Sequence, residues 1–110
     1  MPGERALNCE IGTYFSIGTA QPLTIIAGPC QIETLEHCLM IAEFVKELCA
    51  RHGFNYIFKA SYDKANRTSA ASKRGPGVQE GLKILRAVKN KLSIPVLSDV
   101  HSPNEAEQAG

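Results

Sequence analysis

Apolar residues in this chain fall into short runs separated by longer stretches with helical spacing. Residues 23–27 are short, apolar and β-branched, and they stop before Gly28-Pro29, which is typical of a strand buried on both faces. Residues 54–59 alternate aromatic side chains with others, which predicts a second strand whose aromatic face packs on helices. A third strand is predicted at 94–100, where a short apolar run ends in Ser98-Asp99-Val100-His101.

Each predicted strand is followed by a helix signal. Residues 34–52 keep apolar side chains on one helical face, with Thr34 as N-cap and Gly53 as the left-handed residue after the last turn. A second helix is predicted over 78–92, with a buried stripe at Val78, Leu82, Leu85, Val88 and Leu92. Ser102-Pro103-Asn104-Glu105 is a capping box with proline in the first helical position, and the helix that it starts is expected to be truncated.

The order strand, helix, strand, helix, strand, helix predicts an α/β fold with a parallel sheet and right-handed crossovers. An open doubly wound sheet and a closed eight-stranded barrel both begin in this way. A closed barrel needs roughly 250 residues, so the 23–110 region would form about three βα units of an incomplete barrel. Residues 1–22 are the least periodic part and are predicted to form a separate N-terminal extension with a short strand or hairpin.

Composition narrows the class of protein. The formal net charge is +1, so no overall basic field points to nucleic acid. No apolar run is long enough to span a membrane, and the N-terminus lacks the apolar core of a signal peptide, so we expect a cytoplasmic protein. Cys38 and Cys49 would lie about 16 Å apart on one helix, too far for a disulfide, which favours free thiols in a reducing compartment.

Five basic residues are concentrated between positions 58 and 77, where the second strand gives way to the second helix: Lys59, Lys64, Arg67, Lys73 and Arg74. Ammonium and guanidinium groups at this density predict a site for a small, phosphorylated anion. A solvated loop is the alternative, and composition alone favours neither. Position favours the site, because Lys59 falls on the non-aromatic face of a strand predicted to be buried, where an unpaired charge would be costly.

Polar residues also follow the other two strands. Cys30 could bind a transition metal as a thiolate, or could be a buried thiol behind a tight turn. Asp99 and His101 share the parity of Lys59, so Asp99 could orient a lysine or hold a substrate hydroxyl, or it could cap the third helix instead. The remaining cysteines and histidines are assigned to packing or to helix surfaces: Cys9, Cys38, Cys49, His37 and His52.

Four runs together carry a family pattern: IIAGPCQIET, FKASYDKANRTS, RGPG and SDVH. Over about residues 23–110 the chain resembles the N-terminal part of the 3-deoxy-8-phosphooctulonate (KDO 8-phosphate) synthases. The related DAHP synthases share the Ala-Gly-Pro-Cys start but have a Lys-Pro-Arg element in place of Asp-Lys-Ala-Asn-Arg. The resemblance departs from the family between Ser69 and Arg74, where bulkier residues are common.

The resemblance implies a (β/α)8 TIM barrel preceded by a short N-terminal β-hairpin, and an enzyme of lipopolysaccharide biosynthesis. That enzyme condenses phosphoenolpyruvate with D-arabinose 5-phosphate and water, forms KDO 8-phosphate and releases phosphate. A homotetramer is implied at full length, with no nucleic acid or membrane partner. The alternatives are an inactive fragment of that enzyme and a DAHP synthase-like enzyme that uses erythrose 4-phosphate.

The resemblance also assigns roles to residues of this chain. Lys59 and Lys64 would contact phosphoenolpyruvate and the reacting end of the sugar, and Asp99 would lie at the reacting centre. A cysteine at position 30 marks the metal-dependent class, with the other ligands of the divalent metal ion outside this chain. The remaining implied substrate-binding residues are Ser61, Asn66, Arg67, Thr68 and His101.

Overall fold

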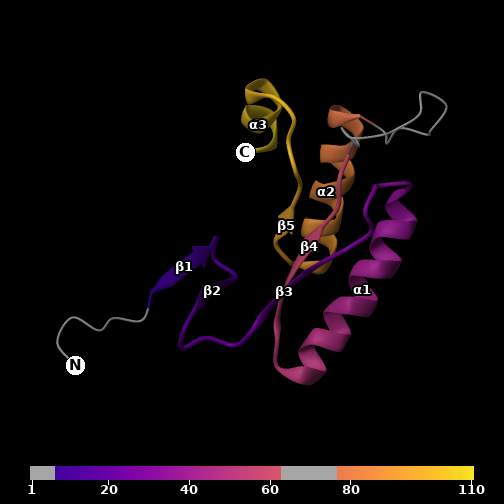
Figure 1. Ribbon diagram of the computed structural model, residues 1–110. Coiled ribbons are helices and arrows are strands. Elements are labelled where there is room, and N and C mark those ends of the chain that lie inside the picture. The colour runs from indigo at the N-terminus through magenta and orange to yellow at the C-terminus, as the bar shows by residue number, and fades with distance from the viewer. Residues whose placement is uncertain (1–6, 63–76) are drawn as a thin grey trace.

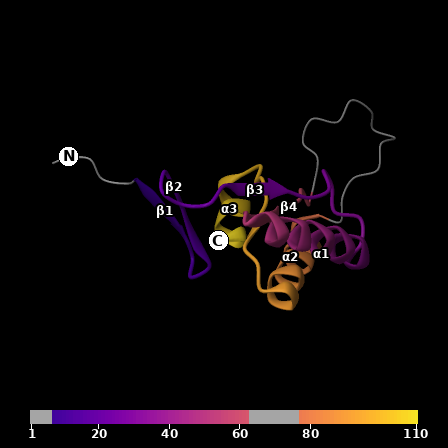
Figure 2. The same cartoon turned by 90° about the horizontal axis from the view of Figure 1, so that it is seen from below.

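A computed structural model describes residues 7–62 and 77–110. Two strands form an antiparallel hairpin, β1 (Asn8–Ile11) and β2 (Phe15–Gly18), and three form a parallel sheet in the order β3 (Thr24–Ala27), β4 (Asn55–Lys59), β5 (Val96–Leu97). The helices are α1 (Leu35–His52), α2 (Val78–Leu92) and α3 (Pro103–Ala109). The predicted N-terminal hairpin and the predicted parallel α/β order are both confirmed. In both views the hairpin lies apart from α1 and α2 (Figures 1 and 2).

The third strand is shorter than the sequence predicted. Only Val96 and Leu97 pair with β4, opposite Phe58 and Lys59, and backbone bonds run from Phe58 N to Pro95 O and from Ala60 N to Leu97 O. On the other side of β4, Ser61 N donates to Cys30 O at 3.3 Å, which continues the pairing of β4 with the chain that follows β3. Residues 98–102 lie outside the strand and lead into α3.

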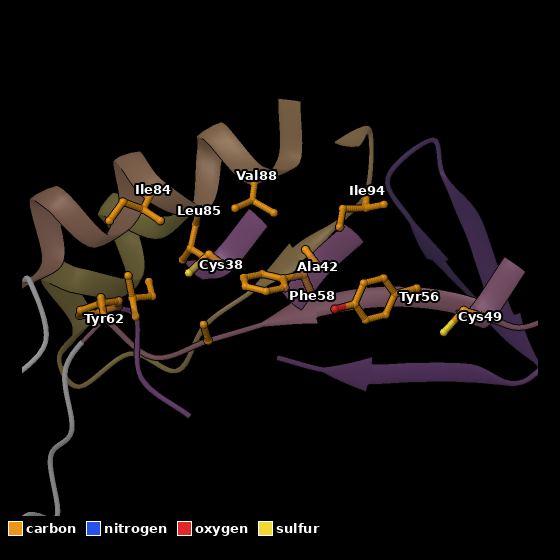
Figure 3. Close-up of a cluster of buried hydrophobic side chains, with 12 residues drawn as sticks. Cys38, Ala42, Cys49, Tyr56, Phe58, Tyr62, Ile84, Leu85, Val88 and Ile94 are labelled. Carbon is orange, nitrogen blue, oxygen red and sulfur yellow. The ribbon is translucent and has the colours of Figure 1, made fainter. Parts of the chain in front are cut away.

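The core lies between the sheet and helices α1 and α2. Tyr56 and Phe58 are 5% and 0% exposed, so the predicted aromatic face of β4 does pack on the helices, whereas Phe54 lies before the strand and is exposed. Figure 3 shows Leu85 and Val88 of α2 pointing toward Phe58. The buried face of α2 differs from the predicted stripe, because Val78, Leu82 and Leu92 are only partly buried; its buried residues are Gly81, Ile84, Leu85 and Val88.

The opposite face of the sheet is only partly covered among the described residues: Ile57 of the central strand is 6% exposed there, whereas the outer strands are open. Ile25 and Ala27 of β3 pack against the core, and Ile26 between them points the other way and is 49% exposed. Leu97, the register partner of Lys59, is 42% exposed on that same face. The expectation that the first strand is buried on both faces is therefore wrong for this chain, since α1 and α2 cover one face only.

The predicted helix ends are confirmed. Thr34 Oγ1 accepts a hydrogen bond from His37 N at 3.0 Å, and Gly53 follows α1 in the left-handed region with φ 72°. At α3, Ser102 Oγ accepts from Glu105 N at 3.1 Å, and Pro103 occupies the first turn. Across the described ranges, 7–62 and 77–110, none of the helices has the length and apolar character that crossing a bilayer would need.

Candidate active site

The carboxyl ends of the three parallel strands bring together residues that are far apart in sequence. Cys30 follows β3, Ser61 follows β4 and Asp99 follows β5. Backbone hydrogen bonds fix the first two, since Ser61 N donates to Cys30 O at 3.3 Å and Ser61 O accepts from Ile32 N at 2.9 Å. Because parallel strands end at one edge, these side chains share a single rim of the sheet, where ligands of parallel α/β proteins bind.

Ser61 and Asp99 form the central contact of this rim. Ser61 is 7% exposed, and its Oγ donates to Asp99 Oδ1 at 2.5 Å. The other carboxylate oxygen, Oδ2, lies 3.4 Å from His101 Nε2. The Asp99 side chain is 40% exposed, so its carboxylate is both held in place and open to an incoming ligand.

The Asp99 carboxylate is stabilised in its charged form. Partial burial acts to raise its pKa, but the Ser61 hydrogen bond, a backbone hydrogen bond and the nearby charges of His101 and Lys59 outweigh it, and the pKa is lowered. The group is therefore ionised at neutral pH, where it can accept a hydrogen bond from a hydroxyl or a water, or pair with an ammonium group.

Lys59 lies on the same side of the sheet as Asp99, as the parity of the two strands predicted. Its register partner is Leu97, two residues before Asp99, and its charge contributes to the lowered pKa of that carboxyl group. The side chain is exposed in this chain, so the argument that burial of its ammonium group demands an anionic partner does not hold here. Lys59 instead offers an accessible positive charge beside an ionised carboxylate.

Sequence reasoning missed two residues that belong to this region. Tyr62 Oη donates to Glu105 Oε1 at 2.5 Å, and the same oxygen accepts from His101 N at 3.3 Å. The Tyr62 and His101 rings meet edge to face with centroids 5.8 Å apart. The capping-box pattern did single out Glu105, but it predicted a bond back to the N-cap residue Ser102 rather than to His101.

Lys64, Asn66, Arg67 and Thr68 lie outside the described residues, so their predicted contacts with substrate stay predictions. The described residues that flank them are joined, since Gly77 N donates to Tyr62 O at 3.2 Å. Tyr62 and Gly77, the described residues on either side of this segment, are therefore neighbours in the structure.

The cysteines differ from several expectations. Cys30 is exposed, which excludes the buried-thiol alternative for it, and Cys9 is exposed on β1, so its assignment to packing is wrong. Cys38 and Cys49 are buried, as the assignment to packing predicted, and burial raises the pKa of both thiols. In the part of the chain that the structure describes, no three His, Cys, Asp or Glu side chains are grouped to hold a metal ion.

A separate hollow of about 350 Å³ lies between α2, β5 and the end of α3. Its lining includes Leu82, Arg86 and Gln108 but none of Cys30, Lys59, Ser61, Asp99 and His101. We place the candidate site at the strand ends rather than in this hollow, because the ionised carboxylate and the accessible cation are found there.

The family model for the DAHP synthetase I family matches residues 7–110, which include every described residue of this rim. The chain belongs to the DAHP synthetase I family. Similar proteins named 2-dehydro-3-deoxyphosphooctonate aldolase, which is KDO 8-phosphate synthase, occur in Xylella fastidiosa and Desulfatibacillum aliphaticivorans. The Xylella protein is 56% identical over 87 residues, covering 79% of this chain and 32% of that protein. The Desulfatibacillum protein is 52% identical over 100 residues, covering 91% of this chain and 37% of its own length.

The family resemblance predicted from sequence is therefore confirmed. A protein of the same name from Xanthomonas campestris is 55% identical over 87 residues. The chain spans about a third of the length of these DAHP synthetase I family relatives.

Proposed function

We propose that the protein containing this chain is a metal-dependent KDO 8-phosphate synthase. It would condense phosphoenolpyruvate with D-arabinose 5-phosphate and water and release phosphate. The observation that carries the proposal is the ionised Asp99, held by Ser61 and facing the same side as Lys59, in a segment that is 52–56% identical to proteins named for this product.

The proposed fold is a (β/α)8 barrel to which this chain contributes the hairpin of 1–22 and the βα units of 23–110. Two features support it. β3 and β5 are the outer strands of the sheet, so each has one edge without a strand neighbour among the described residues. The face opposite the helices carries exposed Ile26 and Leu97, which further strands of a closed barrel would cover.

The first helix supports the same fold. Met40, Phe44 and Leu48 recur every four residues along α1 and are 61%, 67% and 40% exposed. At helical spacing they form one apolar stripe, which differs from the face with buried Cys38, Ala42 and Cys49. A helix of a neighbouring βα unit would bury this stripe.

The chemistry requires two phosphorylated anions to approach each other. Lys59, with Lys64, Asn66, Arg67 and Thr68 of the basic segment, would supply the positive charge and hydrogen bonds that offset their repulsion and orient them. Ser61 and His101 would line the substrate site and hold the Asp99 carboxylate, which would accept a hydrogen bond from the sugar or from water. A carbon–carbon bond forms between the two substrates, water adds, and phosphate leaves.

A divalent metal ion fits one part of this site. The Cys30 thiol is exposed at the same rim and is a suitable soft donor, while the further ligands would come from outside the described residues. Such an ion, when bound, supplies Lewis acidity toward a carbonyl oxygen or a water. The homotetramer and the cytoplasmic location stay predictions.

Phosphate release from phosphoenolpyruvate tests the proposal in the complete protein that contains this chain. We expect release only when arabinose 5-phosphate is present, and erythrose 4-phosphate should not replace it. Release with erythrose 4-phosphate would favour the DAHP synthase-like alternative, and no release with either sugar would contradict the proposal. The 110-residue chain alone is expected to give no turnover.

The role of Lys59 is tested by Lys59→Met, with Lys91→Met on the exposed surface of α2 as a matched control. Lys59→Met should lower kcat/KM by about a hundredfold or more, because a charged contact to an anion is worth about 1.5–3 kcal/mol and the charge also orients the substrate. Lys91→Met should leave it unchanged. Equal activity of the two variants would remove Lys59 from the site.

A further inference from the structure

Tyr62 connects three elements at the point where β4 ends. Its side chain is 1% exposed, and its backbone oxygen accepts from Gly77 N at 3.2 Å, next to the start of α2. A Cβ added at Gly81 of α2 would lie 2.2 Å from the Cβ of Tyr62, so the helix packs directly on this residue. Figure 3 places Tyr62 at the same end of the core as Ile84, away from Cys49.

The hydroxyl of Tyr62 reaches a third element, α3. It donates to Glu105 Oε1 at 2.5 Å, and that oxygen also accepts from His101 N at 3.3 Å. Glu105 is held in turn, because its own N–H donates to Ser102 Oγ. One carboxylate oxygen of Glu105 therefore joins Tyr62, shortly after the end of β4, to His101 in the turn that leads from β5 into α3. We call the Tyr62–Glu105 hydrogen bond the Tyr62–Glu105 pair.

This contact matters because the β4–β5 ladder ends early. After the bond from Ala60 N to Leu97 O, the turn that includes Asp99 is attached to the end of β4 by side chains. Ser61 binds Asp99 and the neighbouring Tyr62 binds Glu105, so two consecutive residues at the end of β4 hold the turn at Asp99 and the first turn of α3 at Glu105. His101 lies between these points, 3.4 Å from Asp99 Oδ2 and bonded to Glu105 through its backbone N–H.

We infer that the Tyr62–Glu105 pair is a positioning device, which holds the Asp99–His101 turn in register with the end of β4. The pair touches neither substrate in this scheme, and it acts through the placement of Asp99 and His101. The inference rests on the proposed function for its catalytic consequence, but the coupling between Tyr62, Glu105 and His101 can be tested without it.

Kinetics of the complete protein test the catalytic consequence. Tyr62→Phe and Glu105→Ala should each lower kcat about tenfold, the fold-change that corresponds to one hydrogen bond to a charged group, while KM for both substrates changes little. The double variant should be no worse than either single variant, since both remove the same contact. Glu105→Gln keeps an oxygen acceptor and should lose about threefold at most, because a neutral acceptor binds roughly half as strongly.

The matched control is Tyr56→Phe. Tyr56 is also buried on β4, and its hydroxyl donates to Ala27 O at 2.9 Å, but it lies six residues before Tyr62, roughly 20 Å along an extended strand. Tyr56→Phe and Tyr62→Phe should both lower the melting temperature, but Tyr56→Phe should leave kcat unchanged. The positioning role is wrong if Tyr62→Phe lowers stability but leaves kcat unchanged. It is also wrong if the losses in kcat of Tyr62→Phe and Glu105→Ala add in the double variant.

Hydrogen–deuterium exchange at the His101 amide gives a readout that is independent of activity. Glu105→Ala removes the acceptor of this amide and should speed its exchange about tenfold, and Tyr62→Phe should speed it too if Tyr62 holds the carboxylate in place. Unchanged His101 exchange in Tyr62→Phe would overturn the inference even in an active enzyme. A protein that releases no phosphate but shows faster exchange would contradict the proposed function and leave the coupling confirmed.

Discussion

Gly81 of α2 offers a test of how closely the helix approaches the site. In Gly81→Ala the new Cβ would lie 2.2 Å from Tyr62 Cβ and 3.3 Å from Tyr62 Cα. Carbon atoms pack best at about 3.5–4.0 Å, so α2 or the end of β4 must move by about 1 Å or more. The clashing atom is the root of a side chain rather than its flexible tip, so a rotamer change cannot relieve the contact.

The expected magnitude follows from two opposing terms. Overpacking a filled core costs about 1–3 kcal/mol, while alanine in place of glycine inside a helix gains about 1 kcal/mol. Because the clash is deep, we expect the substitution to lower the free energy of unfolding by about 1–2 kcal/mol. The same substitution would be stabilising at a helix position with open space.

Urea unfolding of the complete protein, followed by circular dichroism, measures this change. Asn90→Ala is the control, because Asn90 is exposed on the same helix and should gain about 0.5 kcal/mol from helix propensity alone. If Gly81→Ala is as stable as the unsubstituted protein, or more stable, α2 does not pack on Tyr62 as described. The site would then lack one of its supports.

Three further predictions concern the site and its scaffold. Ser61→Ala should raise the pKa of Asp99 toward its ordinary value, measured by carboxyl NMR. Because the folded pKa of Asp99 is lowered, Ser61→Ala should be less stable than the unsubstituted protein at pH 7, and this difference should vanish as the pH falls through that pKa. Ser61→Thr keeps the hydroxyl and is the control. Thr34→Ala should cost about 1 kcal/mol in urea unfolding through loss of the N-cap of α1, and Thr34→Ser should restore it. Cys30→Ala should lower the divalent metal content measured by plasma mass spectrometry, whereas Cys9→Ala, also an exposed thiol, should not; equal metal content would exclude Cys30 as a ligand.

Local sequence signals predicted much of the scaffold because their causes are local. The N-cap at Thr34, the left-handed Gly53 and the Ser102-Pro103 start of α3 each depend on residues within one helical turn, and all three are observed. Strand parity likewise placed Lys59 and Asp99 on one side of the sheet, since alternation along a strand needs no knowledge of its neighbours.

Other features depend on partners that are distant in sequence. β5 ends at Leu97, earlier than its apolar run predicted, and the buried face of α2 includes Gly81, which lies against Tyr62. The exposure of Cys9 depends on how the N-terminal hairpin lies relative to the rest of the chain, which no local sequence pattern encodes.

The sequence by itself determined the family, the order of strands and helices, and the edge of the sheet at which polar residues gather. It could do so because periodicity, capping and motif spacing are properties of neighbouring residues. Only the tertiary structure decided which of those polar groups meet. Ser61 binds Asp99, and Tyr62 binds Glu105, across 38 and 43 residues of chain, because the parallel pairing of β4 with β5 brings the two strand ends within hydrogen-bonding distance.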